Sequence, residues 1–235
     1  MKFWRRRFSA ALTLGLIVGD VRASGLDSLE AAWKDIRDIL PQGPLIAALP
    51  VSAGPPASLR APERWVREER RGEFERVIRV LPKVLYNTGL HELLQAQGHN
   101  SLAVGLAVIK AESELNPLAL SQTGAVGFMQ LMPGTYQEMF ERYNQHFEPG
   151  MDLNLLTQNN VWPNLTAGCL RLKENLEKFK NDPEALEKAV AAYNGGRGRV
   201  HQAELKARRS GGSWLARMPK ETRDYVPKVK ALYHK

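Results

Sequence analysis

The chain has 235 residues, of which 43% are hydrophobic and 25% are charged, and its formal net charge is +8. This length allows one domain with a sizeable core and an N-terminal extension, and the composition is that of an ordinary globular protein. The positive charge suits an anionic polymer or surface but is too small to indicate nucleic-acid binding. The single cysteine, Cys169, excludes an internal disulfide. Because it falls in an apolar helical pattern, we interpret it as a small core residue and not as a nucleophile.

Residues 1–23 predict a signal peptide. A basic start, MKFWRRRF, leads into an apolar segment at 8–19 that is too short to span a bilayer comfortably. The sequence VRA at 21–23 then places small residues at the −3 and −1 positions of a cleavage site. The alternative is a short uncleaved membrane anchor, which Asp20 and Arg22 disfavour because they end the apolar run early. Cleavage would leave a net charge of about +4, and we expect a periplasmic protein of a bacterial envelope.

Residues 24–80 predict an N-terminal extension in three parts. Residues 24–40 have apolar side chains at helical spacing and predict an amphipathic helix. Residues 41–65 contain six prolines and two glycines, which predict an extended connector. Residues 64–80 interleave arginine with glutamate, a pattern typical of a solvated helix and not of a nucleic-acid-binding patch.

Residues 81–235 predict a mainly α domain, because few stretches alternate in the manner of strands. Residues 101–111 are apolar almost all round, which predicts a central buried helix. Residues 164–179 repeat apolar side chains every three or four positions and predict an amphipathic helix.

Capping residues predict where the other helices begin and end. A glycine-rich loop precedes a helix that we expect to be capped near Thr135. A further helix is expected to begin at Asp182, its N-cap, and to stop at the glycine pair that starts with Gly195. Pro219 and Pro227 are expected to bracket a last short helix.

Glu112 directly follows the apolar helix predicted for 101–111. A carboxyl that emerges between apolar walls loses hydration, which raises its pKa and keeps it protonated near neutral pH. A protonated carboxylic acid is the group that a general acid needs to cleave a glycosidic bond.

Several short motifs accompany Glu112 in a fixed order. They are Glu112-Ser113, Gly127-Phe128-Met129-Gln130, NLTAG at 164–168, Ala192-Tyr193-Asn194 and PKETRDYVPKV at 219–229. Together they resemble the catalytic domain of the soluble lytic transglycosylases, relatives of goose-type lysozyme, over about residues 100–230. The resemblance implies a lysozyme-like helical domain with a substrate groove, preceded here by the helical and proline-rich extension.

The resemblance also implies roles for individual residues. Glu112 matches the family's single catalytic acid and base, and Ser121 matches a serine whose hydroxyl bonds that carboxyl. The other residues that match sugar-groove positions are Gln130, Met132, Tyr193 and Asn194. Ser113, Gly127 and Met129 match supporting positions of the motifs, with Met129 expected in the core.

Two positions depart from the family pattern. Phe128 stands where leucine is usual, which keeps the apolar character but changes the shape. Arg171 stands where the family often has tyrosine, which changes the contacts in that part of the groove.

A mechanism with one carboxylate follows from the resemblance. Most glycosidases need two carboxylates, and Glu114 faces away because helix positions two apart do not share a face. The implied reaction is substrate-assisted: Glu112 protonates the oxygen between N-acetylmuramic acid and N-acetylglucosamine, and the C6 hydroxyl then closes a 1,6-anhydro ring. This activity is that of a lyase and requires no cofactor and no metal.

Two other functions remain open from the sequence. One is a lysozyme-type hydrolase, in which Asp152 or Glu141 would activate water; the other is a non-catalytic wall-binding or assembly protein. We expect a monomer whose partners are peptidoglycan glycan strands, with secretion or conjugation machinery as a further candidate and no nucleic acid.

Overall fold

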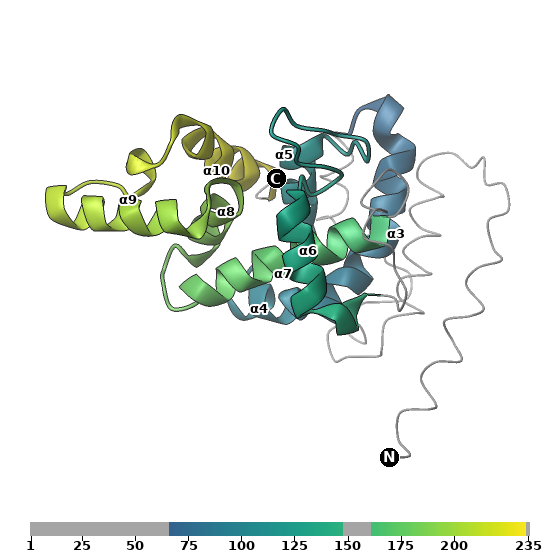
Figure 1. The fold of residues 1–235 in the computed structure, drawn as a ribbon, viewed down its shortest axis with the longest axis horizontal. Coiled ribbons are helices and arrows are strands. Elements are labelled where there is room, and N and C mark those ends of the chain that lie inside the picture. Colours follow the sequence, from purple (N-terminus) through teal and green to yellow (C-terminus); the bar gives the residue numbers. More distant parts are fainter. Residues whose placement is uncertain (1–65, 148–160, 234–235) are drawn as a thin grey trace, which may run out of the picture.

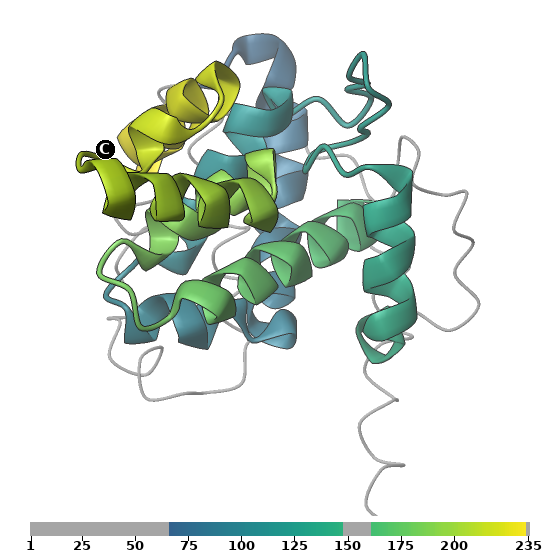
Figure 2. The ribbon, with the colours of Figure 1, turned by 60° about the vertical axis from the view of Figure 1, so that its left-hand side comes forward.

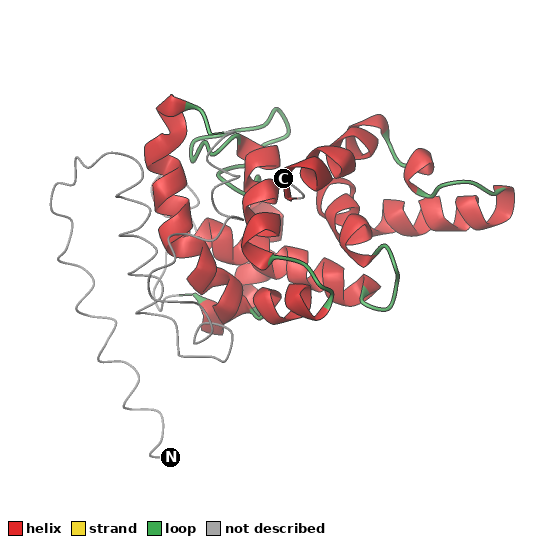
Figure 3. Cartoon of the chain, turned by 180° about the vertical axis from the view of Figure 1, so that it is seen from behind, coloured by secondary structure: helices red, strands yellow, loops and turns green. Residues whose placement is uncertain are grey.

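The computed structural model describes residues 66–147 and 161–233, where the fold is helical and has no extended strand (Figure 3). The predicted signal peptide, the 24–40 helix, most of the proline-rich connector and Asp152 lie outside the described residues. The elements are η2 (Glu68–Arg70), α3 (Arg71–Thr88), α4 (Leu90–Ala96), α5 (Ser101–Ser113), α6 (Pro133–Arg142), η3 (Asn144–His146), α7 (Val161–Phe179), α8 (Ala185–Gly195), α9 (Arg197–Ser210), η5 (Leu215–Arg217) and α10 (Lys220–Tyr233). The mainly α fold predicted from the sequence is therefore confirmed.

Helix α7 forms the centre of the fold and contacts α3, α4, α6 and α8 (Figure 1). Its buried residues occur on most of its circumference, and Cys169 is among them, as predicted. Burial of the thiol raises the pKa of Cys169 to about 12, so the side chain stays protonated and acts as a packing group. The helix predicted for 164–179 is confirmed and begins three residues earlier.

Helix α5 is the buried apolar helix that the sequence predicts. Asn100 caps it, since its Oδ1 accepts a hydrogen bond from the Ala103 N–H at 3.0 Å. Gly105 allows α3 to approach closely, because a Cβ at this position would lie 3.1 Å from Leu81 Cδ2. Helix α10 packs against α5 on its other side, and Figure 2 shows the two helices together. This packing brings the C-terminal part of the chain to the end of α5, where Glu112 lies.

Helix α3 crosses the domain boundary that was predicted between residues 80 and 81. The charged segment that was expected to be solvated forms the first part of this helix and has an apolar face. Phe74, Val77 and Ile78 on that face are buried in the same core as Leu81. The helical domain therefore includes α3 from Arg71 onward, because one face of the charged helix supplies core side chains.

Three helix ends also differ from prediction. Helix α6 begins at Pro133 and not near Thr135, because proline has a suitable φ for a first helical position. Helix α8 begins at Ala185, since Asp182 Oδ1 accepts from the N–H two residues later and closes a turn ahead of the helix. Helix α10 continues through Pro227, which is exposed. No helix in the described ranges is long and apolar enough to cross a membrane.

Candidate active site

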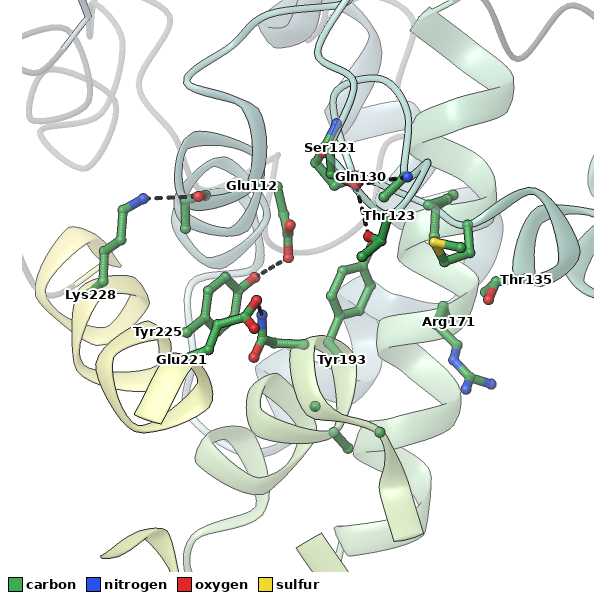
Figure 4. A pocket seen from close by; sticks show the side chains of 18 of the residues that line it. Glu112, Ser121, Thr123, Gln130, Thr135, Arg171, Tyr193, Glu221, Tyr225 and Lys228 are labelled. Carbon is green, nitrogen blue, oxygen red and sulfur yellow. Dashed lines mark hydrogen bonds between the residues drawn. The ribbon is translucent and has the colours of Figure 1, made fainter. Parts of the chain in front are cut away.

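A groove of about 770 Å³ is lined by the end of α5, the loop after it, and parts of α7, α8 and α10 (Figure 4). The structure places in its lining the residues predicted to catalyse or to bind sugar: Glu112, Ser121, Gln130, Met132, Tyr193 and Asn194. Residues that are distant in the sequence thus meet in one cleft because α5, α7, α8 and α10 share a core.

Glu112 lies in the last turn of α5 and points into the groove. Burial removes water from its carboxyl and raises the pKa from 4.5 to about 7. A hydrogen bond from Tyr225 and the charge of Lys228 act in the opposite direction, and the charge of Glu221 adds to the rise. A substantial share of the Glu112 carboxyl groups is therefore protonated at neutral pH, as a general acid requires.

Tyr225 on α10 holds this carboxyl, with its hydroxyl donating to Glu112 Oε1 at 2.6 Å. Tyr225 lies within the motif at 219–229, which by itself indicates no role for this residue. Lys228, one turn further along α10, donates from Nζ to the Ala111 carbonyl at 2.9 Å. The Lys228 ammonium group thereby lies beside the last carbonyl groups of α5, which have no hydrogen-bond partner within the helix. Helix α10 therefore closes the end of α5 and orients its acid.

Ser121 makes different contacts from those expected. Its Oγ accepts a hydrogen bond from the Ala125 N–H at 2.8 Å and lies 3.0 Å from Thr123 Oγ1. The hydroxyl therefore shapes the turn at 121–125, and the side-chain partner of the Glu112 carboxyl is Tyr225. The resemblance implied that Ser121 lies in the groove and bonds the acid; the residue does line the groove, but the hydroxyl in that bond is that of Tyr225.

Gln130 ties the loop after α5 together. Its Nε2 donates to the carbonyl oxygens of Ala119 at 2.9 Å and Gly127 at 3.0 Å. Its backbone has φ 44°, a conformation that L residues rarely adopt. Met132 follows at the rim of the groove, where 43% of the residue is exposed. The loop thus presents one side chain that fixes its own shape and one that faces the open groove.

Asn164 anchors the same loop to α7. Its Oδ1 accepts from the Met129 N–H at 2.8 Å, and its Nδ2 donates to the Val126 carbonyl at 3.2 Å. A Cβ on Gly127, whose φ is 78°, would lie 2.6 Å from Asn164 Nδ2, so only glycine fits there. Tyr193 adds a third tie, because its hydroxyl donates to the Met129 carbonyl at 2.8 Å. Met129 is therefore the buried base of the loop, as predicted.

Replacing Asn164 is expected to destabilise the protein at the loop that it bonds. In Asn164→Ala the buried Met129 N–H loses its partner, which should lower the free energy of unfolding by about 2 kcal/mol. Urea unfolding monitored by circular dichroism measures the change. The exposed Asn144→Ala serves as the control and should stay within about 0.5 kcal/mol of wild type. Equal stabilities of the two variants would show that Asn164 does not anchor the loop.

Asn194 joins α8 to the start of α10. Its Oδ1 accepts from Thr222 Oγ1 at 2.7 Å, and its Nδ2 donates to Glu221 Oε1 at 3.3 Å. Gly195 permits this approach, since a Cβ there would lie 2.7 Å from Thr222 Oγ1.

Ser113 forms a hydrogen bond within α5, because its Oγ donates to the Ile109 carbonyl at 3.1 Å. The described residues contain no group of three or more His, Cys, Asp and Glu side chains that could hold a metal ion.

Tyr225→Phe is expected to change the pH dependence of the reaction. The Tyr225 hydroxyl stabilises the ionised form of Glu112, so its removal should raise the Glu112 pKa further. If Glu112 acts as the acid, the alkaline limb of kcat/KM should move to higher pH. Tyr193→Phe is the matched control, since that hydroxyl bonds Met129 and not Glu112. An unmoved limb in Tyr225→Phe would contradict the assigned contact.

Comparisons with known proteins identify the family of the chain. Residues 86–214, more than half of the chain, match the family described as "Transglycosylase SLT domain". The chain is 30% identical over 125 residues to membrane-bound lytic murein transglycosylase D of Escherichia coli K12, covering 52% of this chain and 25% of that protein. It is 32% identical over 136 residues to the soluble lytic murein transglycosylase of Salmonella typhimurium, covering 56% and 20%.

The crystal structure of the 70 kDa soluble lytic transglycosylase of Escherichia coli has a similar fold. It aligns with a TM-score of 0.50 and 24% identity, over 75% of this chain and 28% of that one. The chain spans about a quarter or less of the length of the curated relatives it matches. Because the family model matches residues 86–214, more than half of the chain, the chain belongs to the transglycosylase SLT domain family.

Proposed function

We propose that the chain is a lytic transglycosylase that cleaves the β-1,4 bond between N-acetylmuramic acid and N-acetylglucosamine in peptidoglycan. The observation that carries the proposal is the Glu112 carboxyl, which lies in the groove with a pKa of about 7 and a hydrogen bond from Tyr225. The names of the related lytic murein transglycosylases support the choice of murein as substrate.

In the proposed reaction, Glu112 gives its proton to the glycosidic oxygen as the bond to the anomeric carbon breaks. The acetamido oxygen of the muramic acid stabilises the positive charge on that carbon. Glu112, now a carboxylate, takes the proton of the C6 hydroxyl, and O6 attacks the anomeric carbon to form the 1,6-anhydro ring. The burial of Glu112 suits both proton transfers, because it keeps the carboxylic acid protonated before cleavage and makes the carboxylate a stronger base afterwards.

A hydrolase is the second candidate, because two more carboxylates line the groove. Glu221 accepts a hydrogen bond from Asn194, and Asp224 pairs with Lys220 at 2.5 Å. Either carboxylate could activate water. Glu141, which the sequence offered for this role, does not line the groove and bonds Gln137 instead.

The masses of soluble products from peptidoglycan sacculi separate these candidates. A transglycosylase releases muropeptides one water lighter than hydrolysis products, and Glu221→Gln and Asp224→Asn should leave that mass unchanged. Products with a free reducing end would overturn the proposal and favour hydrolysis. Binding to sacculi without any product would favour a wall-binding protein.

We further propose that the protein acts in the bacterial envelope after export, where its substrate lies. A role in opening the wall for a secretion or conjugation apparatus is part of this proposal. Co-purification of the chain with such an apparatus from envelope fractions tests it, and recovery of the chain only from the cytosolic fraction would contradict export.

A further inference from the structure

A cluster of arginines surrounds one buried carboxylate beside the groove. Its members are Glu174, Glu138, Arg142, Arg171 and Arg197, which we call the arginine cluster. Glu174 Oε1 accepts from Arg142 Nη1 at 2.5 Å and from the Tyr143 hydroxyl at 3.0 Å. Its Oε2 accepts from Arg171 Nη1 at 3.3 Å and from Arg197 Nη2. Burial raises the pKa of Glu174, but hydrogen bonds from Arg197, Arg142 and Tyr143 outweigh it and hold the pKa below its usual value.

The arginine cluster carries more positive than negative charge. Three guanidinium groups face two carboxylates, Glu174 and Glu138. Arg142 bonds both carboxylates, and Arg197 bonds Glu174 and, through Nε, Asn175 Oδ1 at 2.7 Å. One positive charge is therefore left without a matching carboxylate in the cluster.

Arg171 is the member whose charge is least satisfied. A single nitrogen, Nη1, approaches both carboxylates, at 3.3 Å from Glu174 and 4.0 Å from Glu138. Its Nε and Nη2 have no hydrogen-bond partner among the residues that the structure describes. Only 22% of the side chain is exposed, and its position is fixed by the pairing with Glu174. Among the described residues, Arg171 therefore has donors without a partner, on a side chain that the pairing with Glu174 orients.

Arg171 is also the only member of the cluster that lines the groove. In Figure 4 it lies across Tyr193 from Glu112, on the side of Thr135, while Lys228 lies at the opposite side of the groove. A ligand that fills the groove past Glu112 would meet an arginine with free donors there.

We propose that Arg171 forms a carboxylate-binding subsite for the acidic branch that a muramyl sugar carries, an inference that rests on the proposed function. Guanidinium N–H groups recognise planar carboxylates well and can do so in pairs. The sugar rings of peptidoglycan are uncharged, so its acids lie on the lactyl and peptide branch. The subsite favours strands with free carboxylates over strands in which these groups are amidated or absent.

Equilibrium binding to glycan fragments tests the subsite without requiring turnover. Calorimetry in a Glu112→Gln background would compare fragments with free stem-peptide carboxylates, the same fragments after amidation, and peptide-free fragments with a free lactyl carboxyl. Adding Arg171→Gln should weaken binding of the free-carboxylate fragments about tenfold and leave amidated fragments unchanged. The lactyl carboxyl is an amide wherever a stem peptide is attached, so a loss on peptide-bearing fragments assigns a stem-peptide carboxylate as the bound group. A loss confined to peptide-free fragments assigns the lactyl carboxyl.

Arg142→Gln is the matched control, because it removes the same charge from the same cluster but does not line the groove. Arg171→Lys should show an intermediate loss, since it keeps the charge and loses the paired donors. Equal weakening by Arg171→Gln and Arg142→Gln, or equal weakening on free and amidated fragments, would overturn the subsite. Anhydro products with no carboxylate preference would overturn the subsite alone, whereas a carboxylate preference with reducing-end products would overturn the proposed function alone.

Discussion

Glu112→Gln should lower the rate of release of soluble muropeptides from sacculi by about a thousandfold or more. A positioned acid and base contributes about 10² to 10⁴ to a rate, and Glu112 is proposed to act in both proton transfers. Glutamine has nearly the same shape, and its amide oxygen can still accept from the Tyr225 hydroxyl. The loss therefore reports the missing proton transfers and not a change in the groove. Chromatography of released muropeptides over time measures it.

Glu141→Gln is the control for this experiment. The Glu141 carboxylate is exposed, bonds Gln137 and does not line the groove, so its removal should leave the rate within about twofold of wild type. A Glu112→Gln variant that keeps more than a tenth of the wild-type rate would contradict the assignment of Glu112 as the acid.

The same substitution should stabilise the protein at neutral and alkaline pH. Folded Glu112 holds its proton up to a pH of about 7, whereas the unfolded chain releases it near 4.5. The native state therefore binds more protons between these values, and wild-type stability falls as the pH rises through this window. A pKa difference of this size is worth about 3 kcal/mol. Glutamine cannot ionise, so Glu112→Gln should avoid that loss.

Urea unfolding of both proteins at several pH values between 4 and 8 measures this effect. The free energy of unfolding of Glu112→Gln minus that of wild type should rise by about 3 kcal/mol across the series and then level off. Other titrating groups are common to the two proteins and cancel in the difference. A difference that stays constant with pH would mean that the Glu112 carboxyl is not desolvated in the folded state.

Helix α5 shows which parts of the fold could be predicted from sequence. Its apolar residues have no polar face, and Asn100 is a good cap, so local patterns sufficed. For α3 the sequence predicted a helix over part of its length but took that helix to be solvated, whereas one face of it is buried and packs against α7. Helix α9 was not predicted, since just two of its residues, Val200 and Ala203, are buried.

In the groove, too, features that are local in sequence could be predicted and contacts between distant residues could not. The motifs located Glu112, Gln130 and Tyr193 because each motif is local in sequence. The contact between Glu112 and Tyr225 joins residues 113 positions apart, and nothing local favours Tyr225 over Ser121 as the partner. The charge excess at Arg171 likewise depends on α6, α7 and α9 meeting around Glu174, which the sequence does not display.

A direct titration of the Glu112 carboxyl tests the central claim most directly. The ¹³C resonance of its carboxyl carbon, assigned by its loss in Glu112→Gln, would be followed by NMR between pH 3 and 9. The structure predicts a midpoint near pH 7, and a higher one in Tyr225→Phe. A midpoint near 4.5 would show a hydrated carboxylate that is ionised at neutral pH, and Glu112 could not then serve as the acid that begins the reaction.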